Sequence, residues 1–401
     1  MRIGHTIYLD HQATTPVDAR VFSAMAPYFG ESFGNPHSVD HCLGWQAAQA
    51  VEDAAVRVAG LIGADADEIV FTSGATEANN LALLGLGRRA SGGKRRRILV
   101  SAVEHKCVLA VCRVLHEQLG YRIESLPVDA AGFVDMAALK ELLADDVLAV
   151  SIMAVNNEIG TIQDITGLSE VIRGSGALFH CDAAQAPCAI DFHKLFQFVD
   201  LLSVSGHKIY GPQGVGALFI RRDLQNRIEP LVYGGGQQRN LRSGTVPVAL
   251  CVGMGASAAL LNTPEADEER AALRRRRDSF VRKLTDLSWP IVLNGPESAH
   301  RHPGNANMRF EGFDAHDILS TLQPRLAAST GSACTSGIPE PSHVLRAIGL
   351  SSDEAESSIR FSIGRNTTDA DLEEAVALID ESLSRLAKGN LFHQHERHRA
   401  I

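Results

Sequence analysis

Lys208 has the clearest chemical potential in this sequence, because it follows a small, polar turn at the end of a mostly apolar run. The run covers residues 199–204, and the turn is Ser205-Gly206-His207. A lysine amine that is partly removed from water loses its proton more easily and can form a Schiff base with an aldehyde cofactor. The alternative is an ordinary solvated lysine at a strand-to-loop corner, and this short segment alone favours that alternative.

Several other polar residues stand where a predicted strand meets a loop or a helix. Ser73-Gly74-Ala75-Thr76 begins a helix and offers backbone N–H groups and a hydroxyl to a phosphate, although serine or threonine there is also a common helix cap. Asp182 follows an apolar strand, and Gln185 lies three residues further on. His105 begins another helix, and an imidazole can stack on a flat ring or move protons near neutral pH. Asp182 as a helix cap and His105 as a structural histidine are the alternatives.

Cys334 differs from the other cysteines in its surroundings. The chain has seven cysteines, an odd number without a CxxC pair, so a disulfide framework is not expected. Cys181 and Cys251 lie in apolar segments and are expected to be buried. Cys334 lies within residues 329–337, a run of small and polar residues that predicts a loop. Burial therefore does not explain this thiol.

Alternating strands and helices surround these residues and predict an α/β fold. Short apolar strands are expected at 68–72, 98–101, 148–155, 177–181, 199–204 and 215–220, and helices ending near 86, at 104–119 and at 168–173. This alternation favours a mostly parallel sheet covered by helices on both faces. Ligands of such open sheets collect beyond the carboxyl ends of the strands, where Asp182 and the turn before Lys208 fall.

The chain is long enough for two packed domains, at 401 residues. An apolar helix at 248–261 leads into a charged stretch at 265–277, which we interpret as a domain junction with the basic run 274–277 on a solvated helix face. Strands at 306–310 and 359–363, and helices at 315–322, 342–348 and from 369 to about 386, predict a smaller α/β domain. We assign residues 14–261 to the large domain, and residues 1–13 and 262–401 to the small one.

Composition and charge exclude several classes of protein. Apolar residues at 45% and charged residues at 21% are typical of a folded globular chain. Because no apolar run approaches the roughly 20 residues of a spanning helix and no apolar signal core is present, we expect a cytoplasmic protein without membrane contact. The net charge, 38 − 47 = −9, does not favour direct binding to nucleic acid. The histidine-rich tail at 392–398 is interpreted as a frayed terminus, and no metal site is expected.

The order and spacing of these segments resemble the pyridoxal-phosphate-dependent cysteine desulfurases of the IscS/NifS type, from about residue 8 to 386. The resemblance implies the type I fold of pyridoxal-phosphate-dependent transferases, pyridoxal 5′-phosphate as cofactor, and conversion of L-cysteine to L-alanine. The matching segments are LDHQATTP at 9–16, FGNPHS at 33–38, FTSGATEANN at 71–80, EH at 104–105, NNEIG at 156–160, HCDAAQ at 180–185, SGHK at 205–208, RSGT at 242–245, GSACTSG at 331–337 and IRFS at 359–362.

The resemblance also implies how the cofactor is held. Lys208 would form the Schiff base and then act as the base on the α-carbon of the substrate. Asp182 would keep the pyridine nitrogen protonated, His105 would stack on the ring as a catalytic residue, and Gln185 would bind the ring hydroxyl. In a homodimer, Thr245 would reach the phosphate held by the partner subunit. Within one subunit the phosphate would be bound by Ala75, Thr76, Ser205 and His207.

For the substrate, the resemblance implies a clamp and a nucleophile. Arg360 would bind the carboxylate of L-cysteine with its forked guanidinium, assisted by Asn157. The Cys334 thiolate would attack the substrate sulfur, carry it as a persulfide and pass it to a sulfur-acceptor protein. The sequence leaves open whether the sulfur serves iron-sulfur clusters, tRNA thiolation or DNA modification.

Two departures from the family pattern and two alternative functions remain. His11-Gln12 replaces the commoner pair of small residues, and the tail after Leu386 does not resemble the docking tail of the housekeeping members. Another transferase or lyase of the same fold, such as an aminotransferase or a selenocysteine lyase, would keep Lys208 and Asp182 but has no use for the Cys334 loop. A cofactor-free sulfur carrier would be colourless, whereas a lysine Schiff base gives a yellow protein.

Overall fold

A seven-stranded sheet forms the main body of the computed structural model, which describes residues 1–193, 195–331 and 341–399, with side chains up to residue 388. Five neighbouring strands run parallel, and β9 is antiparallel to both strands beside it. The predicted, mostly parallel α/β sheet is therefore confirmed. The strand order is β3 (Ile69–Thr72), β9 (Gly216–Ile220), β8 (Leu201–Ser205), β7 (Leu178–Asp182), β6 (Val147–Ser151), β4 (Arg97–Ser101) and β5 (Arg122–Leu126).

Helices cover both faces of this sheet. One face packs against α2 (Cys42–Ile62), α5 (Met136–Leu142), α6 (Ile165–Ser175) and α7 (Val248–Leu261), and the other against α3 (Ala75–Arg89) and α4 (Lys106–Leu119). Every residue of β6, β7, β8 and β9 is buried, as a sheet covered on both sides requires. Within the described residues, no helix has both the length and the apolar composition needed to cross a membrane.

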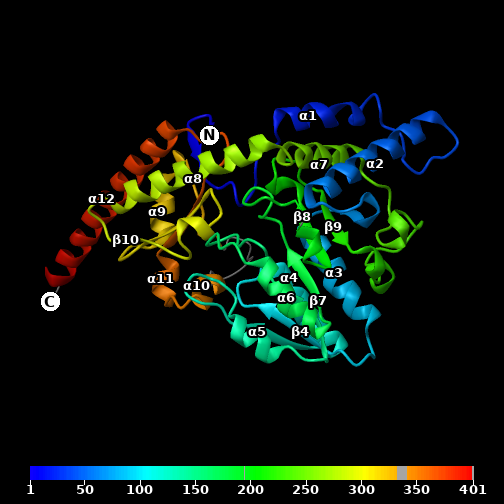
Figure 1. Cartoon of the computed structure of the whole chain (residues 1–401). Coiled ribbons are helices and arrows are strands. Elements are labelled where there is room, and N and C mark those ends of the chain that lie inside the picture. The colour runs from blue at the N-terminus through cyan, green and yellow to red at the C-terminus, as the bar shows by residue number, and fades with distance from the viewer. Residues whose placement is uncertain (194, 332–340, 400–401) are drawn as a thin grey trace.

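A second group of elements packs around a smaller antiparallel sheet (Figure 1). This sheet has the order β10 (Ile291–Leu293), β11 (Asn305–Phe310) and β13 (Ser358–Ser362). Figure 1 shows α8 (Pro264–Thr285) beside α12 (Asp369–Arg399), and both contribute to one apolar core with α9 (Ala315–Leu322). Ile7 and Leu9 from the start of the chain belong to the same core. The domain limits at 13/14 and 261/262 stay a prediction.

Short elements connect these parts. A strand group of β1 (Arg2–Ile3), β2 (Thr6–Tyr8) and β12 (Leu326–Ala327) holds the start of the chain against the second group. The helix α1 (Ala19–Met25) packs on α7, and α10 (His343–Ala347) packs on α11 (Ser352–Glu356).

Three expectations for single elements are wrong. The basic run 274–277 is not wholly solvated, because Arg277 is 1% exposed and donates to the backbone carbonyls of His302 and Asn305, which take the place of water around its buried guanidinium. The C-terminal tail is not frayed, because α12 continues past Leu386 to Arg399. The strand expected at 148–155 ends at Ser151, and the following residues form the loop beneath the site.

The buried cysteines follow their prediction. Cys181 on β7 and Cys251 on α7 are both fully buried in the core of the large sheet. All cysteines in the described part of the chain are free thiols.

Replacement of Gly216 by alanine is expected to destabilise the sheet beside α3. A Cβ on Gly216 would lie 2.6 Å from backbone atoms of Gly74 and 2.7 Å from the Val204 carbonyl, and none of these can rotate away. We expect the free energy of unfolding to fall by about 1–3 kcal/mol, measured by urea denaturation. Gly174→Ala is the control, because its Cβ would meet nothing within 4 Å and helix α6 should gain about 0.5–1 kcal/mol. An unchanged Gly216→Ala midpoint would contradict this packing.

Candidate functional site

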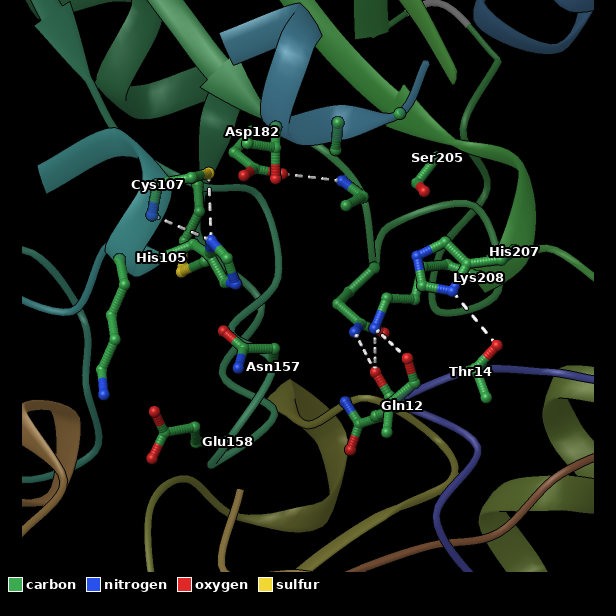
Figure 2. A pocket seen from close by; sticks show the side chains of 18 of the residues that line it. Gln12, Thr14, His105, Cys107, Asn157, Glu158, Asp182, Ser205, His207 and Lys208 are labelled. Atoms are coloured by element: carbon green, nitrogen blue, oxygen red, sulfur yellow. Dashed lines mark hydrogen bonds between the residues drawn. The ribbon is translucent and has the colours of Figure 1, made fainter. Parts of the chain in front are cut away.

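A cavity of about 570 Å³ lies at the carboxyl ends of β6, β7 and β8 (Figure 2). Ten of the predicted site residues line it, although they come from separate parts of the chain. Thr245 does not line the cavity and is exposed, and Cys334 lies outside the described residues. The ten residues are Ala75, Thr76, His105, Asn157, Asp182, Gln185, Ser205, His207, Lys208 and Arg360.

Asp182 is the last residue of β7 and points into this cavity from a buried position. Its side chain is 5% exposed, so its charge needs hydrogen-bond donors in place of water. The amide nitrogen of Asn79 on α3 donates to one oxygen at 2.7 Å, and the backbone N–H of Ala184 donates to the other at 2.9 Å. Two fixed donors thus hold the carboxylate as an acceptor for a further N–H group in the cavity.

A buried chain of hydrogen bonds supports Asn79 from behind. Its Oδ1 lies 3.1 Å from Nε2 of His180, whose Nδ1 lies 2.8 Å from the hydroxyl of Ser151. That hydroxyl is 3.4 Å from the carboxyl group of Glu104. Because the Asn79 nitrogen donates to Asp182, its oxygen must accept from His180 Nε2–H, and His180 Nδ1 must accept from Ser151. In this arrangement Ser151 donates to His180, His180 donates to Asn79, and one N–H of Asn79 donates to Asp182.

Burial sets the protonation of the outer members of this chain. Burial and the charge of Asp182 raise the pKa of Glu104 well above its usual value. Burial lowers the pKa of His180 to about 4, although Asp182 opposes this shift. His180 is therefore neutral near pH 7, and burial favours the neutral form of Glu104. Burial thus disfavours a charge on both of these groups behind Asp182.

Lys208 follows β8 and reaches across the cavity to the beginning of the chain. Its Nζ donates to the backbone carbonyls of Gln12 and Ala13, at 2.8 Å for Ala13. Gln185 also donates to the Gln12 carbonyl, at 2.9 Å. Figure 2 shows the Lys208 amine above Gln12 and near the ring of His207. The fold therefore holds this amine inside the cavity rather than at a solvated corner.

His105 caps the N-terminus of α4 and presents its ring to the cavity. Its Nδ1 accepts the backbone N–H of Cys107 at 3.2 Å and lies 3.0 Å from the sulfur of the same residue. Burial, with the charge of Asp182, raises the pKa of Cys107 to about 12, so the thiol keeps its proton and donates it to Nδ1. Burial also lowers the pKa of His105. A neutral His105 with Nδ1 occupied carries its proton on Nε2.

The N-terminus of α3 forms the end of the cavity that suits an anion. The first-turn N–H groups, at Ala75 and Thr76, have no partner within the helix, and the helix dipole adds positive potential there. Glu77 in the same turn is paired with Arg242 at 2.9 Å, so its charge is compensated. Ser205 and His207 line the cavity with these groups. Burial and the Lys208 charge lower the pKa of His207 to about 4, so its ring is neutral.

Arg360 lies on β13 of the smaller sheet and reaches the other side of the cavity. Its guanidinium donates to Asp10 at 2.7 Å, to the Ser329 hydroxyl at 3.0 Å and to the Asn157 carbonyl at 2.8 Å. The residue is 3% exposed, and its Nε is buried without a partner among the described residues. Arg360 is therefore a fixed cationic donor at the wall formed by the second group of elements.

The two ends of the undescribed segment that contains Cys334 meet this cavity. Gly331 before the segment and His343 after it both line the cavity. His343 is held by the Glu104 carbonyl at 2.8 Å from its Nε2, and Ser342 donates to Glu158, another lining residue. The segment thus begins and ends at the site.

Sequence reasoning assigned no role to several residues that build the site. Asn79, Glu104 and Glu158 lie in quoted motif segments, but only the fold shows that they support Asp182 or the cavity wall. Cys107 was outside any motif, and its contact with His105 is local, two residues away. The pattern H-x-C at the start of a helix is therefore a local signal for a contact between the two side chains.

A family model, a protein of similar sequence and solved structures of similar fold all relate this chain to the same group of proteins. Residues 7–375 match the model of the aminotransferase class-V family. The chain is 46% identical over 382 residues to a protein named cysteine desulfurase IscS from Rickettsia typhi, covering 95% of this chain and 92% of the relative. A solved structure titled NifS-like protein has a TM-score of 0.87 and 32% identity, covering 96% of this chain and all of the other. A second, titled SspA in complex with cysteine, has a TM-score of 0.77 and 34% identity, covering 90% and 99% of the two chains.

Acid is expected to destabilise the fold through its buried neutral histidines. Burial lowers the pKa of His180 to about 4 and that of His302 to about 3, whereas an unfolded histidine titrates near pH 6.5. The unfolded chain therefore binds protons that the folded chain excludes, so stability present above about pH 6.5 is lost as the pH falls toward 4. Urea denaturation between pH 8 and 5 should show this loss.

The variant His302→Gln isolates one of these groups outside the cavity. Below about pH 6 its free energy of unfolding should fall less steeply than that of the wild type, by up to about 1.4 kcal/mol per pH unit. Parallel pH profiles for the two proteins would show that His302 does not carry the effect.

Proposed function

Because the chain belongs to the aminotransferase class-V family and, within it, to the cysteine desulfurases of the IscS/NifS type, we propose that it converts L-cysteine to L-alanine. The family is pyridoxal-phosphate-dependent, and we propose the same cofactor for this chain. One observation carries the proposal: the Lys208 amine, the Asp182 carboxylate and the N-terminus of α3 line a single cavity. The amine complements the aldehyde of the cofactor, the carboxylate complements its pyridine N–H, and the helix N-terminus complements its phosphate.

The residues present fit pyridoxal 5′-phosphate. Ala75, Thr76, Ser205 and His207 would hold its phosphate, and Asp182 would accept the pyridine N–H with an oxygen already oriented by Asn79. Gln185 would bind the hydroxyl group of the cofactor ring. His105 would stack on the face of that ring. When bound, the cofactor withdraws electrons from the α-carbon of an amino acid.

The side chains of this protein would then position the substrate and move its protons. Arg360 and Asn157 would bind the carboxylate of L-cysteine, which fixes the α-carbon with respect to Lys208. Lys208 Nζ would take the α-proton, since its own carbonyl acceptors at Gln12 and Ala13 hold it within the cavity. His105 presents Nε2–H as a donor from the opposite wall.

Cys334 would receive the sulfur. Its thiolate would form a bond to the substrate sulfur while the bond between that sulfur and the β-carbon breaks. The β-carbon would then take a proton, and Lys208 would return the proton to the α-carbon to give L-alanine. The product on the enzyme is a Cys334 persulfide, which a sulfur-acceptor protein would take up. Gly331 and His343 at the cavity support this role, because the segment between them starts and ends beside the substrate position.

We also propose that the active form is a homodimer. Large apolar side chains are exposed along the first quarter of the chain, where Phe22, Phe29, Phe33 and Trp45 are each about 60% exposed or more. Exposed aromatic surface of this kind is typical of a protein interface. Thr245 is exposed and lies outside the cavity of its own subunit. This position suits a residue that binds the cofactor phosphate held by a partner subunit.

The Cys334→Ala variant tests the proposed reaction. With L-cysteine labelled at sulfur, the wild type should carry the label on Cys334 and form L-alanine. The variant should bind no label and form L-alanine more than about 100-fold more slowly, while keeping its yellow colour, because only the nucleophile is lost.

Cys42→Ala is the matched control, since Cys42 is an exposed thiol outside the cavity. It should keep both the label and the rate. Unaltered L-alanine formation in Cys334→Ala would assign the chain to another transferase or lyase reaction, and a colourless protein that binds no pyridoxal 5′-phosphate would favour a cofactor-free sulfur carrier.

A further inference from the structure

Gln12 brings an unused hydrogen-bond donor to the cavity. The residue belongs to the His11-Gln12 pair that departs from the family pattern, and it lines the cavity with 2% of its surface exposed. Its side-chain oxygen accepts a hydrogen bond from Nδ2 of Asn305 at 2.6 Å. Its side-chain nitrogen is buried without a partner among the described residues. A buried amide nitrogen without an acceptor is costly, so its presence at a cavity points to a ligand.

The orientation of the Gln12 amide is fixed by a group that can only donate. Arg301 is fully buried and donates to Asn305 Oδ1 at 2.9 Å and to the Ile159 carbonyl at 2.8 Å. A guanidinium has no acceptor, so Asn305 must place its oxygen toward Arg301 and its nitrogen toward Gln12. The Gln12 oxygen must then face Asn305. Rotating the Gln12 amide by half a turn would set two donors against each other, so its N–H groups stay where they are.

The Gln12 side chain lies at the part of the cavity assigned to the substrate. Figure 2 shows the Gln12 side chain below Lys208, with its amide nitrogen on the side toward Asn157. Asp10, two residues before Gln12, accepts from Arg360 at 2.7 Å, so the chain itself brings Gln12 close to the guanidinium. Arg360 Nε is a second buried donor without a partner in the described residues.

The charges at this wall explain why a neutral donor matters. Asp10 already compensates the guanidinium of Arg360, and Ser329 donates to the same Asp10 oxygen at 3.0 Å. An incoming carboxylate therefore meets an ion pair rather than a bare cation. An additional N–H donor with no charge to compensate adds attraction for the carboxylate, and a carboxylate has enough lone pairs to accept from several donors.

We propose that Gln12 binds the carboxylate of the amino-acid substrate through its side-chain N–H and makes the site select amino acids over amines that lack a carboxylate. The proposal rests on the proposed function, because it takes an amino acid as the substrate. Gln12 is in this view a substrate-binding residue, oriented by Asn305 and Arg301.

Two amines that carry no sulfur to transfer test the proposal on the cofactor-loaded protein. L-Alanine carries the carboxylate and ethylamine does not, and the affinity of each follows from the change in cofactor absorption on titration. Gln12→Met keeps the length of the side chain but removes its N–H groups. This variant should bind L-alanine about 10–100-fold more weakly and ethylamine within about 2-fold of the wild type.

Gln12→Glu is the second variant, and it carries the test if Gln12→Met does not fold as judged by its melting temperature. It keeps the oxygen that Asn305 needs and sets a carboxylate against the ligand carboxylate, so L-alanine should again lose at least 10-fold relative to ethylamine. Gln213→Met is the control. Gln213 also lines the cavity, but its nitrogen already donates to Thr14 at 3.3 Å, so the ratio of the two affinities should not change.

Equal weakening of both probes in the Gln12 variants would mean that Gln12 only shapes the cavity, and unchanged affinities would mean that it does not touch the ligand. Either result overturns the inference. Neither depends on turnover, so failure of the proposed function is recognised separately, as a wild-type protein that forms no L-alanine from L-cysteine.

Discussion

The burial of one carboxylate, that of Asp182, constrains the centre of this molecule. A charge at the buried end of a strand is tolerated only when fixed donors replace water, and here they come from α3 and from the turn after β7. The requirement extends outward, since Asn79 can donate to Asp182 only if His180 donates to it in turn. The buried charge of Asp182 is therefore stabilised by groups from the sheet and from the helix that begins at the anion-binding end. The helix capped by His105 packs beside them.

A second set of contacts joins the smaller sheet to this centre. Residues at the start of the chain contact Lys208 through their backbone carbonyls and Arg360 through Asp10, so one short segment links both walls of the cavity. Arg301 extends this link from behind by fixing Asn305 and, through it, Gln12. A site built in this way has donors and acceptors whose directions are set before any ligand arrives, which reduces the cost of organising them on binding.

The sequence predicted what local pattern controls. Apolar runs at β7, β8 and β9 have strand length and lie between turn residues, so the sheet and the position of Asp182 and Lys208 at its edge could be predicted. The prediction for Arg277 was wrong because four consecutive basic residues indicate a solvated helix face. The carbonyls that accept from its buried guanidinium lie more than twenty residues later in the chain. The orientation of Gln12 depends on Asn305 and Arg301, almost three hundred residues later in the chain, and no local signal could show it.

The most direct measurement of the central claim is chemical mapping of the bound cofactor. The protein loaded with pyridoxal 5′-phosphate is reduced with borohydride, digested and searched for the peptide that carries the pyridoxyl group. The account predicts modification of Lys208, in the peptide that contains Ser205-Gly206-His207. Modification of Lys106, the other lysine that lines the cavity among the described residues, or of no lysine at all, would contradict it.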